Sequence, residues 1–385
     1  MKTIFHIIAS LLFCTTISFA QNNHGFVIPQ EKFVDTLDID MIDQKPMVKV
    51  KIGEKTYRFL FDTGSTITYL STADMPGVTL TGDSSIVNGT NGSKTECMAT
   101  ISDMQIGSLK FKNISAVIHK VHATTIEDGI LGYDLLQAGI VAKFMLKDKK
   151  IILTNNPSIF ESEKGKRISL DKNIPLFIAE PFKGFKVPTL LDTGSPYGFL
   201  LSLDQWRYYI RSNKIPKNVK KQIIWYNKQT MHQDLHNDIN DEFFFKFENI
   251  KVKDLNFHQI AGHTTIVPFS TFGTQLLSEF DFILNTSRKE VVFLSDQKEF
   301  YPKTQGVQFK VITFLNDPKV NVLCLNPYSE LFKLGVRTLD IIDEVDGIVI
   351  DNEATFVKVC SGKSSYHAKF KKDDGTVIEA DVVGY

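Results

Sequence analysis

The chain has 385 residues, with 44 basic and 44 acidic side chains and a formal net charge of zero. This length allows two or three domains, each with a core of its own. The balanced charge, without a long basic run, removes the electrostatic attraction on which nucleic-acid binding mostly depends, so we expect no nucleic-acid partner.

The first 20 residues have the three regions of a secretory signal peptide. Lys2 precedes an apolar run from Ile4 to Cys14, and small residues end the segment at Ala20. The run is shorter than the ~20 apolar residues that a membrane-spanning helix needs, so an N-terminal membrane anchor is the weaker alternative. We therefore expect residues 1–20 to be removed, and the mature protein to be exported without a membrane span.

A pattern of alternating apolar residues leads twice into the tetrapeptide Asp-Thr-Gly-Ser. The first copy, FLFDTGS, ends at Ser65, and the second, TLLDTGS, ends at Ser195. Each copy is preceded by the pattern of a β-hairpin, with its turn at Gly53 in the first case and near Gly184 in the second. Two copies in matching contexts indicate a common origin.

Similar segments follow each copy in the same order. An apolar stretch ends at Gly132 and, in a weaker form with Thr271 in place of an aliphatic residue, at Gly273. A short helical pattern and a hairpin with a charged turn come next, the hairpins starting at Val141 and Phe280. The period of about 130 residues is too long for a solenoid repeat, so the sequence predicts a duplicated domain.

The duplication sets the expected domain boundaries. We expect a first lobe at residues 31–156, a second at 162–296, a linker at 297–305 and a third domain at 306–385. Duplicated lobes tend to pack about a pseudo-twofold axis, where equivalent loops meet, so the two Asp side chains should lie side by side. Two carboxyls so placed share one proton and can activate a water molecule between them.

These motifs resemble those of the pepsin and retropepsin superfamily of aspartic peptidases, most closely the bacterial members that carry both lobes in one chain. The resemblance covers roughly residues 31–296 and rests on the two Asp-Thr-Gly-Ser copies and on Ile130-Leu131-Gly132. It implies a mainly β, bilobal fold of two β-barrel lobes. It also implies that Asp62 and Asp192 are catalytic, without a metal or another cofactor.

The resemblance gives roles to the three residues that follow each Asp. The Thr side chains bond across to the opposite lobe, the Gly residues shape the loops, and the Ser hydroxyls bond the outer oxygen of the preceding Asp. These residues are Thr63, Gly64, Ser65, Thr193, Gly194 and Ser195. Because a hydroxyl that donates to a carboxylate lowers its pKa, we expect an acidic to mildly acidic pH optimum.

The segment SSIVNGTNGSKT, residues 84–95, reads as an exposed hairpin tip because it is rich in residues that tolerate positive φ. In the superfamily a hairpin at this place is the flap that closes over the substrate. No Tyr stands where pepsin-like flaps carry one. The expected flap residues are Asn88, Gly89, Thr90, Asn91 and Gly92.

Residues 306–385 resemble bacterial PDZ domains in the pattern that runs from Ser329 through Gly335 and Asp340 to Asp346-Gly347. A PDZ domain binds an extended C-terminal peptide by adding it as a strand to a sheet edge. A purely structural module is the alternative, because Gln308 replaces a Gly of the binding loop. The expected binding loop is Gly306, Val307, Gln308 and Phe309.

The remaining cysteines and histidines point to no further chemistry. After Ala20 the cysteines are Cys97, Cys324 and Cys360, an odd number that is no disulfide scaffold. A Cys324–Cys360 disulfide stays open, although buried free thiols are the better interpretation. His232 and His236 have helical ligand spacing but no acidic third ligand, and His119 and His122 are as weak, so we expect no metal site.

Together these features predict a monomeric aspartic endopeptidase of the bacterial periplasm or extracellular space, acting on peptide or protein substrates. The alternative is a non-catalytic peptide-binding envelope protein that uses the cleft or the PDZ groove. The presence of both Asp residues within intact Asp-Thr-Gly-Ser favours the peptidase. Pairing of single lobes from two chains is a third possibility, which the duplication makes unnecessary.

Overall fold

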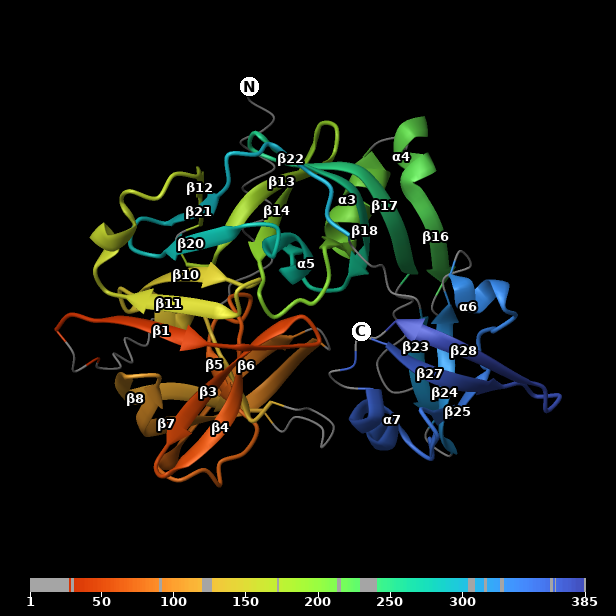
Figure 1. Cartoon of the computed structure of the whole chain (residues 1–385), viewed down its shortest axis with the longest axis horizontal. Helices are drawn as coiled ribbons and strands as arrows, with labels where there is room; N and C mark the ends of the chain where they lie inside the picture. Colours follow the sequence, from red (N-terminus) through yellow and green to blue (C-terminus); the bar gives the residue numbers. More distant parts are fainter. Residues whose placement is uncertain are drawn as a thin grey trace.

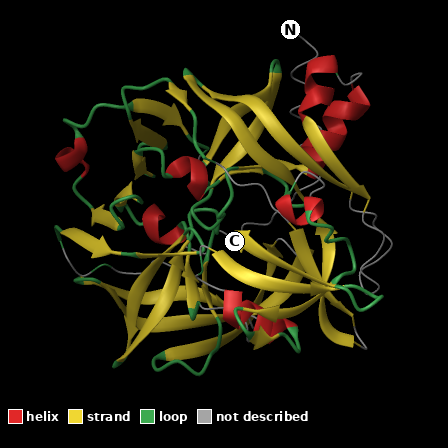
Figure 2. Cartoon of the chain, turned by 45° about the vertical axis from the view of Figure 1, so that its right-hand side comes forward, coloured by secondary structure: helices red, strands yellow, loops and turns green. Residues whose placement is uncertain are grey.

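The computed structural model consists mainly of strands, gathered in four sheets with a few short helices between them (Figure 1). The described residues are 28, 31–89, 92–119, 127–171, 173–212, 216–228, 241–303, 309–314, 317–325, 329–360, 363 and 365–383. Several expected features lie outside these residues: the signal segment, Thr90, Asn91, His122, His232, His236, Gly306, Val307 and Gln308. The prediction of a mainly β chain is confirmed, as the predominance of strands in Figure 2 makes plain.

The first eight-stranded sheet comes from the first third of the chain. Its strands are β2 (Asp40–Ile42), β3 (Lys45–Ile52), β4 (Lys55–Phe61), β5 (Thr68–Leu70), β6 (Val78–Gly89), β7 (Gly92–Ile106), β8 (Leu109–Ile118) and β9 (Gly129–Leu131). They lie in the order β2-β3-β4-β9-β5-β8-β7-β6, and a further pairing of β3 with β7 curls the sheet back on itself. The β3–β4 hairpin expected before the first Asp is present.

The second eight-stranded sheet repeats the central part of the first. Its strands are β13 (Leu176–Phe182), β14 (Phe185–Leu191), β15 (Phe199–Ser202), β16 (Ile223–Lys228), β17 (Asp241–Val252), β18 (Leu255–Thr265), β19 (Ser270–Phe272) and β22 (Glu299–Phe300). In both sheets a strand that ends directly before an Asp pairs in parallel with a short strand that ends directly before a Gly. These pairs are β4 with β9 and β14 with β19, and the next strands, β5 and β15, pair antiparallel to the short strands.

A six-stranded sheet joins segments from both halves of the chain (Figure 1). Its strands, in sheet order, are β1 (Val34–Asp38), β11 (Lys150–Thr154), β10 (Val141–Met145), β20 (Asp281–Asn285), β21 (Glu290–Leu294) and β12 (Lys166–Ser169). The two hairpins expected from Val141 and Phe280 form its centre, where β10 pairs antiparallel with β20. This pairing holds the two eight-stranded sheets in one body.

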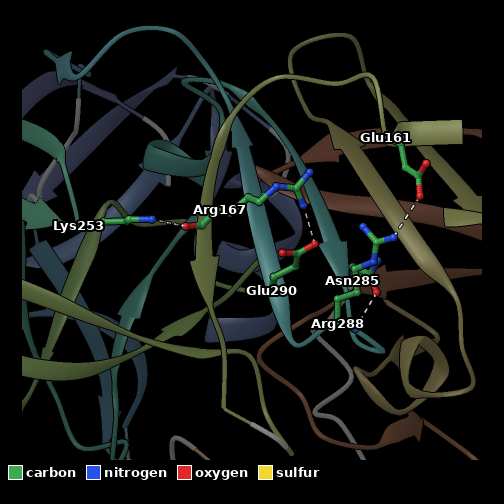
Figure 3. Close-up of polar contacts among 6 residues, drawn as sticks. All are labelled: Glu161, Arg167, Lys253, Asn285, Arg288 and Glu290. Atoms are coloured by element: carbon green, nitrogen blue, oxygen red, sulfur yellow. Dashed lines mark hydrogen bonds and ion pairs between the residues drawn. The ribbon is translucent and has the colours of Figure 1, made fainter. Parts of the chain in front are cut away.

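Polar contacts at the edge of the six-stranded sheet join two of its strands and connect it to neighbouring segments, among them the one around η1 (Pro157–Phe160). Arg167 contacts Glu290 at 2.8 Å, Arg288 contacts Glu161 at 3.2 Å, and Lys253 donates to the carbonyl of Arg167 (Figure 3). Such exposed pairs are worth at most about 1 kcal/mol each, so they adjust the edge rather than hold the sheet.

Aromatic side chains fill the core that lies under the sheets. The ring of Phe61, directly before Asp62, meets Phe144 edge-on at 5.5 Å, and Phe144 stacks on Phe282 across the β10–β20 pair at 4.6 Å. All three side chains are fully buried. Burial of such a ring contributes roughly 2–3 kcal/mol, so this stack ties the end of β4 firmly to the six-stranded sheet.

Few helices accompany the sheets. Those of the first two sheets are α2 (Asp134–Gln137), α3 (Leu203–Ser212), α4 (Lys217–Gln222) and α5 (Thr274–Leu277). Trp206 on α3 is fully buried against Phe182 and Phe245, whereas Tyr208 on the same helix is exposed. Among the described helices none is long and apolar enough to cross a membrane.

The C-terminal part forms a separate sheet with its own core, coloured blue in Figure 1. Its elements are β23 (Phe309–Phe314), β24 (Asp317–Leu325), α6 (Glu330–Lys333), β25 (Ile341–Val345), β26 (Ile348–Val349), α7 (Glu353–Cys360), β27 (Ser365–Lys371) and β28 (Val377–Val383). Cys360 is buried with a free thiol, while the side chain of Cys324 lies outside the described part.

The expected linker is partly a structural element. Glu299 and Phe300 form β22, which pairs in parallel with β18, and Phe300 is buried against Phe257. The first part of the expected linker, residues 297–305, is thus attached to the second eight-stranded sheet, and the linker itself stays a prediction. The sequence around β22 is charged and contains Pro, so it shows no strand pattern, and the apolar side chain of Phe300 anchors the strand.

Candidate functional site

Asp62 and Asp192 each stand at the end of a buried strand. The N–H of Asp62 donates to the carbonyl of Leu131 at 2.9 Å, and the N–H of Asp192 donates to the carbonyl of Phe272 at 3.1 Å. Each Asp is thereby fixed to the short parallel strand beside it. The repeated strand arrangement thus brings two equivalent turns into the same position relative to their sheets.

Backbone N–H groups hold one oxygen of each carboxyl. Oδ1 of Asp62 accepts from the N–H groups of Gly64 at 2.8 Å and Ser65 at 3.2 Å. Oδ1 of Asp192 accepts from Gly194 at 2.9 Å and Ser195 at 3.0 Å. The second oxygen of each carboxyl is therefore not bound by these N–H groups, and this is the same in both copies.

The two turns are joined by four buried hydrogen bonds. The hydroxyl of Thr63 donates to the carbonyl of Leu191 at 2.6 Å and accepts from the N–H of Thr193 at 3.1 Å. The reciprocal bonds run from the hydroxyl of Thr193 to the carbonyl of Phe61 at 2.6 Å and from the N–H of Thr63 to that hydroxyl at 3.0 Å. The contacts expected of the two Thr residues are present.

Gly64 and Gly194 occupy places where a side chain does not fit. A Cβ on Gly64 would lie 2.6 Å from Oδ1 of Asp192, and one on Gly194 would collide with the carboxyl of Asp62. Each Gly therefore lets the opposite Asp approach closely. The requirement comes from this approach, since neither Gly has a positive φ.

The carboxyls of Asp62 and Asp192 lie close together, since each lies against the Gly of the opposite turn. Two such carboxyls share one proton more readily than they both ionise. Burial raises the pKa of Asp62, although the backbone N–H groups oppose this. Burial, and then the charge of Asp62, raises the pKa of Asp192 well above its usual range. Both residues keep part of their surface exposed, so a water molecule or a substrate can reach the pair. The arrangement holds one shared proton over a pH range above that of an ordinary carboxyl.

The expectation for the two Ser hydroxyls is wrong. The hydroxyl of Ser65 donates to the carbonyl of Ile67 at 2.8 Å, and the hydroxyl of Ser195 has no partner among the described residues. The Ser residues reach the carboxylates through their backbone N–H groups instead, because the tight turn points those groups at the Asp oxygens. A bond from the Ser hydroxyls therefore does not lower the pKa of either Asp.

The Gly that ends each short strand lies under the corresponding turn. A Cβ on Gly132 would lie 2.5 Å from the backbone of Ile67, and one on Gly273 would collide with the backbone of Tyr197. The N–H groups of Tyr133 and Thr274, one residue later, donate to the carbonyls of Ser65 and Ser195. The weaker second copy therefore makes the same contacts as the first.

Asp134, which the sequence analysis missed, lies directly behind the first turn. One oxygen accepts from the N–H of Thr68 at 3.1 Å, and the other lies 3.2 Å from the Thr68 hydroxyl. Burial raises the pKa of Asp134 to about 7. An acidic residue in the otherwise apolar segment DGILGYDLL was the signal that could have identified it.

The raised pKa of Asp134 makes the stability of the protein depend on pH. Between the ordinary pKa of 3.8 and about 7, Asp134 keeps its proton in the folded protein but is ionised in the unfolded chain. The free energy of unfolding should therefore fall as pH rises through this window. At ~1.4 kcal/mol per pKa unit, the loss by pH 8 amounts to about 4 kcal/mol. Asp134→Asn, which keeps an acceptor for Thr68, should remove most of this loss.

Denaturant unfolding at pH 5 and pH 8 measures this effect. The dyad contributes a slope of the same sign, so the comparison is between wild type and variant, with the exposed Asp40→Asn as control. Equal pH dependence in wild type and Asp134→Asn would contradict the prediction.

The remaining expected sites are described only in part. β6 and β7 form the hairpin expected at residues 84–95, paired up to Gly89 and Gly92, with the side chains of Asn88 through Ser93 not described. Of the expected PDZ loop, only the backbone of Phe309 is described, at the start of β23 on the edge of its sheet. Among the described residues no cluster of His, Cys, Asp and Glu could hold a metal ion.

Comparison with known families agrees with the first half of this site. Residues 48–135 match the family described as aspartyl protease, a stretch that contains Asp62, the β6–β7 hairpin, Gly132 and Asp134. This part of the chain is therefore an aspartyl protease-like domain. No curated protein matches the chain.

Proposed function

We propose that the protein is an aspartic endopeptidase in which Asp62 and Asp192 together activate a water molecule. The observation that carries the proposal is the set of four reciprocal bonds of Thr63 and Thr193, which brings two partly buried carboxyls close together. Neither carboxyl alone could both take and give a proton in the same step.

The proposed reaction follows from the shared proton. The ionised carboxyl takes a proton from the water, whose oxygen bonds to the carbonyl carbon of the substrate, while the protonated carboxyl gives its proton to the carbonyl oxygen. The carboxyl that took the proton of the water then gives it to the amide nitrogen, the carbon–nitrogen bond breaks, and a hydroxyl of the tetrahedral intermediate gives its proton to the other carboxyl as the carbonyl re-forms. The dyad ends with one proton, ready for the next cycle.

We assign the chain two lobes, at residues 31–156 and 162–296, and a C-terminal PDZ-like domain at 306–385. The two sheets with equivalent strand pairs support the lobes, and the separate C-terminal core supports the third domain. The PDZ-like domain would bind a peptide or part of the substrate at β23, an edge strand of its sheet. We further propose that the protein is exported and acts as a monomer.

The pH dependence of peptide cleavage tests the proposal. The rate should rise and fall with pH, because activity needs a single proton on the dyad. Since burial raises both pKa values, the alkaline fall should lie above pH ~4.5, where ordinary carboxyls have lost their protons. A library of peptides incubated between pH 3 and pH 8, with and without pepstatin, measures the profile. No cleavage at any pH, or cleavage insensitive to pepstatin and still rising at pH 8, would contradict it.

A further inference from the structure

The β6–β7 hairpin leaves the first sheet at one defined residue pair. β7 pairs with β8 as far as Cys97 and Ile118, and beyond this point β7 pairs only with β6, from Ser85–Glu96 to Gly89–Gly92. Glu96 is thus the first residue of β7 beyond the support of β8. Any movement of the outer hairpin relative to the sheet must start here.

A side-chain contact bridges this point. Nδ1 of His119 lies 2.8 Å from Oε1 of Glu96, and the Glu96 side chain is only 19% exposed. His119 directly follows β8, and its own N–H donates to the carbonyl of Leu70 on β5 at 2.9 Å. His119 therefore connects Glu96, at the root of the hairpin, to β5 through its side chain on one side and its backbone N–H on the other.

Tyr69 on β5 continues the connection toward the dyad. Its ring meets the ring of His119 edge-on, with centroids 6.3 Å apart. Ser65, in the turn of Asp62, lies four residues before Tyr69, and its hydroxyl donates to the carbonyl of Ile67 between them. Burial, and then the charge of Asp62, raises the pKa of Tyr69 to about 12, so the Tyr69 hydroxyl lies within the electrostatic reach of the dyad and keeps its proton at all working pH values.

In the second half of the chain, the position equivalent to Tyr69 is occupied by a Phe. Phe199 follows Asp192 at the same interval at which Tyr69 follows Asp62. Phe199 is fully buried and has no hydroxyl, and the Ser195 hydroxyl has no partner among the described residues. The contact of Tyr69 with His119 therefore distinguishes the first half from the second, which has a β16–β17 hairpin of its own and a different edge-on contact, between Tyr197 and His263.

We propose that Glu96, His119 and Tyr69 are positioning residues that fix the root of the β6–β7 hairpin relative to the turn of Asp62. This proposal rests on the proposed peptidase function, in which the outer hairpin covers the substrate. An extended peptide held between hairpin and dyad needs both at a fixed separation, because small displacements of a bound substrate reduce the rate strongly.

Substitution of Glu96 separates the hydrogen bond from the negative charge. Glu96→Ala removes the contact to His119, whereas Glu96→Gln keeps a group that bonds Nδ1 in either tautomer. We expect Glu96→Ala to raise KM for an extended peptide about tenfold with a smaller change in kcat, and Glu96→Gln to stay within about twofold of wild type. Tyr69→Phe keeps the ring contact to His119 but removes the hydroxyl near the dyad, and should lower kcat more than it changes KM.

Hydrogen exchange of the hairpin gives a readout that needs no substrate. Backbone amides of residues 84–89 and 92–97 should exchange faster in Glu96→Ala than in wild type, and Glu96→Gln should restore protection. Asp103→Ala removes an exposed ion pair with Lys112 between β7 and β8, and should change neither exchange nor KM.

The outcomes separate this inference from the peptidase function. Faster exchange in Glu96→Ala with restoration by Glu96→Gln supports the connection even if the wild type cleaves nothing, in which case only the peptidase proposal fails. Unchanged exchange and KM in Glu96→Ala, or an equal effect of Glu96→Gln, would overturn the positioning role while cleavage by wild type upheld the peptidase.

Discussion

Replacement of either Asp62 or Asp192 by Asn should lower kcat for peptide cleavage by at least about 10³-fold, because each variant leaves the dyad without one of its two proton carriers. The double variant should be little worse than either single variant, since the two residues act as a unit. The same substitutions should raise the free energy of unfolding at pH 7, because they remove a buried carboxyl whose pKa is raised.

Single-turnover kinetics and denaturant unfolding, made on the same preparations, test both parts of this prediction. Asp40→Asn changes an exposed Asp of the first sheet and serves as the control for loss of a carboxylate. If Asp62→Asn cleaves at the wild-type rate, the dyad is not the catalytic group. If it is inactive but also less stable than wild type, loss of fold rather than loss of chemistry explains the result.

The sequence was sufficient for the repeated part of the fold because the apolar pattern and the turn residues agree there. Gly53, Gly184 and the charged turns of the later hairpins mark chain reversals that depend on local backbone preference. Local signals could not show that β10 pairs with β20, since this contact joins residues far apart in the chain. The strand at Glu299–Phe300 was missed for the same reason, because its one buried ring matters only when β18 is beside it.

Within the site, the sequence predicted residue identity better than residue geometry. Both Asp, both Thr and both Gly have the expected places, because each copy of the motif is one short turn whose contacts repeat. The Ser hydroxyls do not, since a hydroxyl rotor settles on whichever acceptor the fold brings near, here Ile67 in one copy. Asp134 and Glu96 act through contacts with Thr68 and His119, which no sequence spacing reveals.

The two halves of the site are therefore alike in backbone and different in side chains. Thr63 and Thr193 make equivalent bonds, whereas the carboxyl of Asp134 bonds Thr68 in the first half and the hydroxyl of Thr274 bonds the carbonyl of Ser195 in the second. The pKa is raised for both carboxyls of the dyad, and for Asp192 the charge of Asp62 adds to the effect of burial. An asymmetric dyad can hold its proton in a preferred place, which a strictly symmetric pair cannot do.

Removal of the hydroxyl of Thr63 should both destabilise the protein and lower its kcat for peptide cleavage. Thr63→Val keeps the shape of the side chain but leaves the carbonyl of Leu191 and the N–H of Thr193 without their partner in a fully buried place. Each unsatisfied group costs about 1–3 kcal/mol, so the two together should cost about 2–6 kcal/mol. Because the same bonds set the distance between the carboxyls, kcat should fall about 10²-fold or more.

The effect should depend on Thr193, and a double-mutant cycle shows whether it does. Once one turn has moved, the bonds of the other are already weakened, so Thr63→Val and Thr193→Val together should cost less than the sum of the two. Thr63→Ser, which keeps the hydroxyl, should stay near wild type. Thr189→Val is the matched control, because Thr189 is equally buried but its hydroxyl bonds to Val187 within its own strand. Strict additivity of the two Val substitutions, or a loss of kcat in Thr189→Val as large as in Thr63→Val, would show that the four bonds do not set the geometry of the dyad.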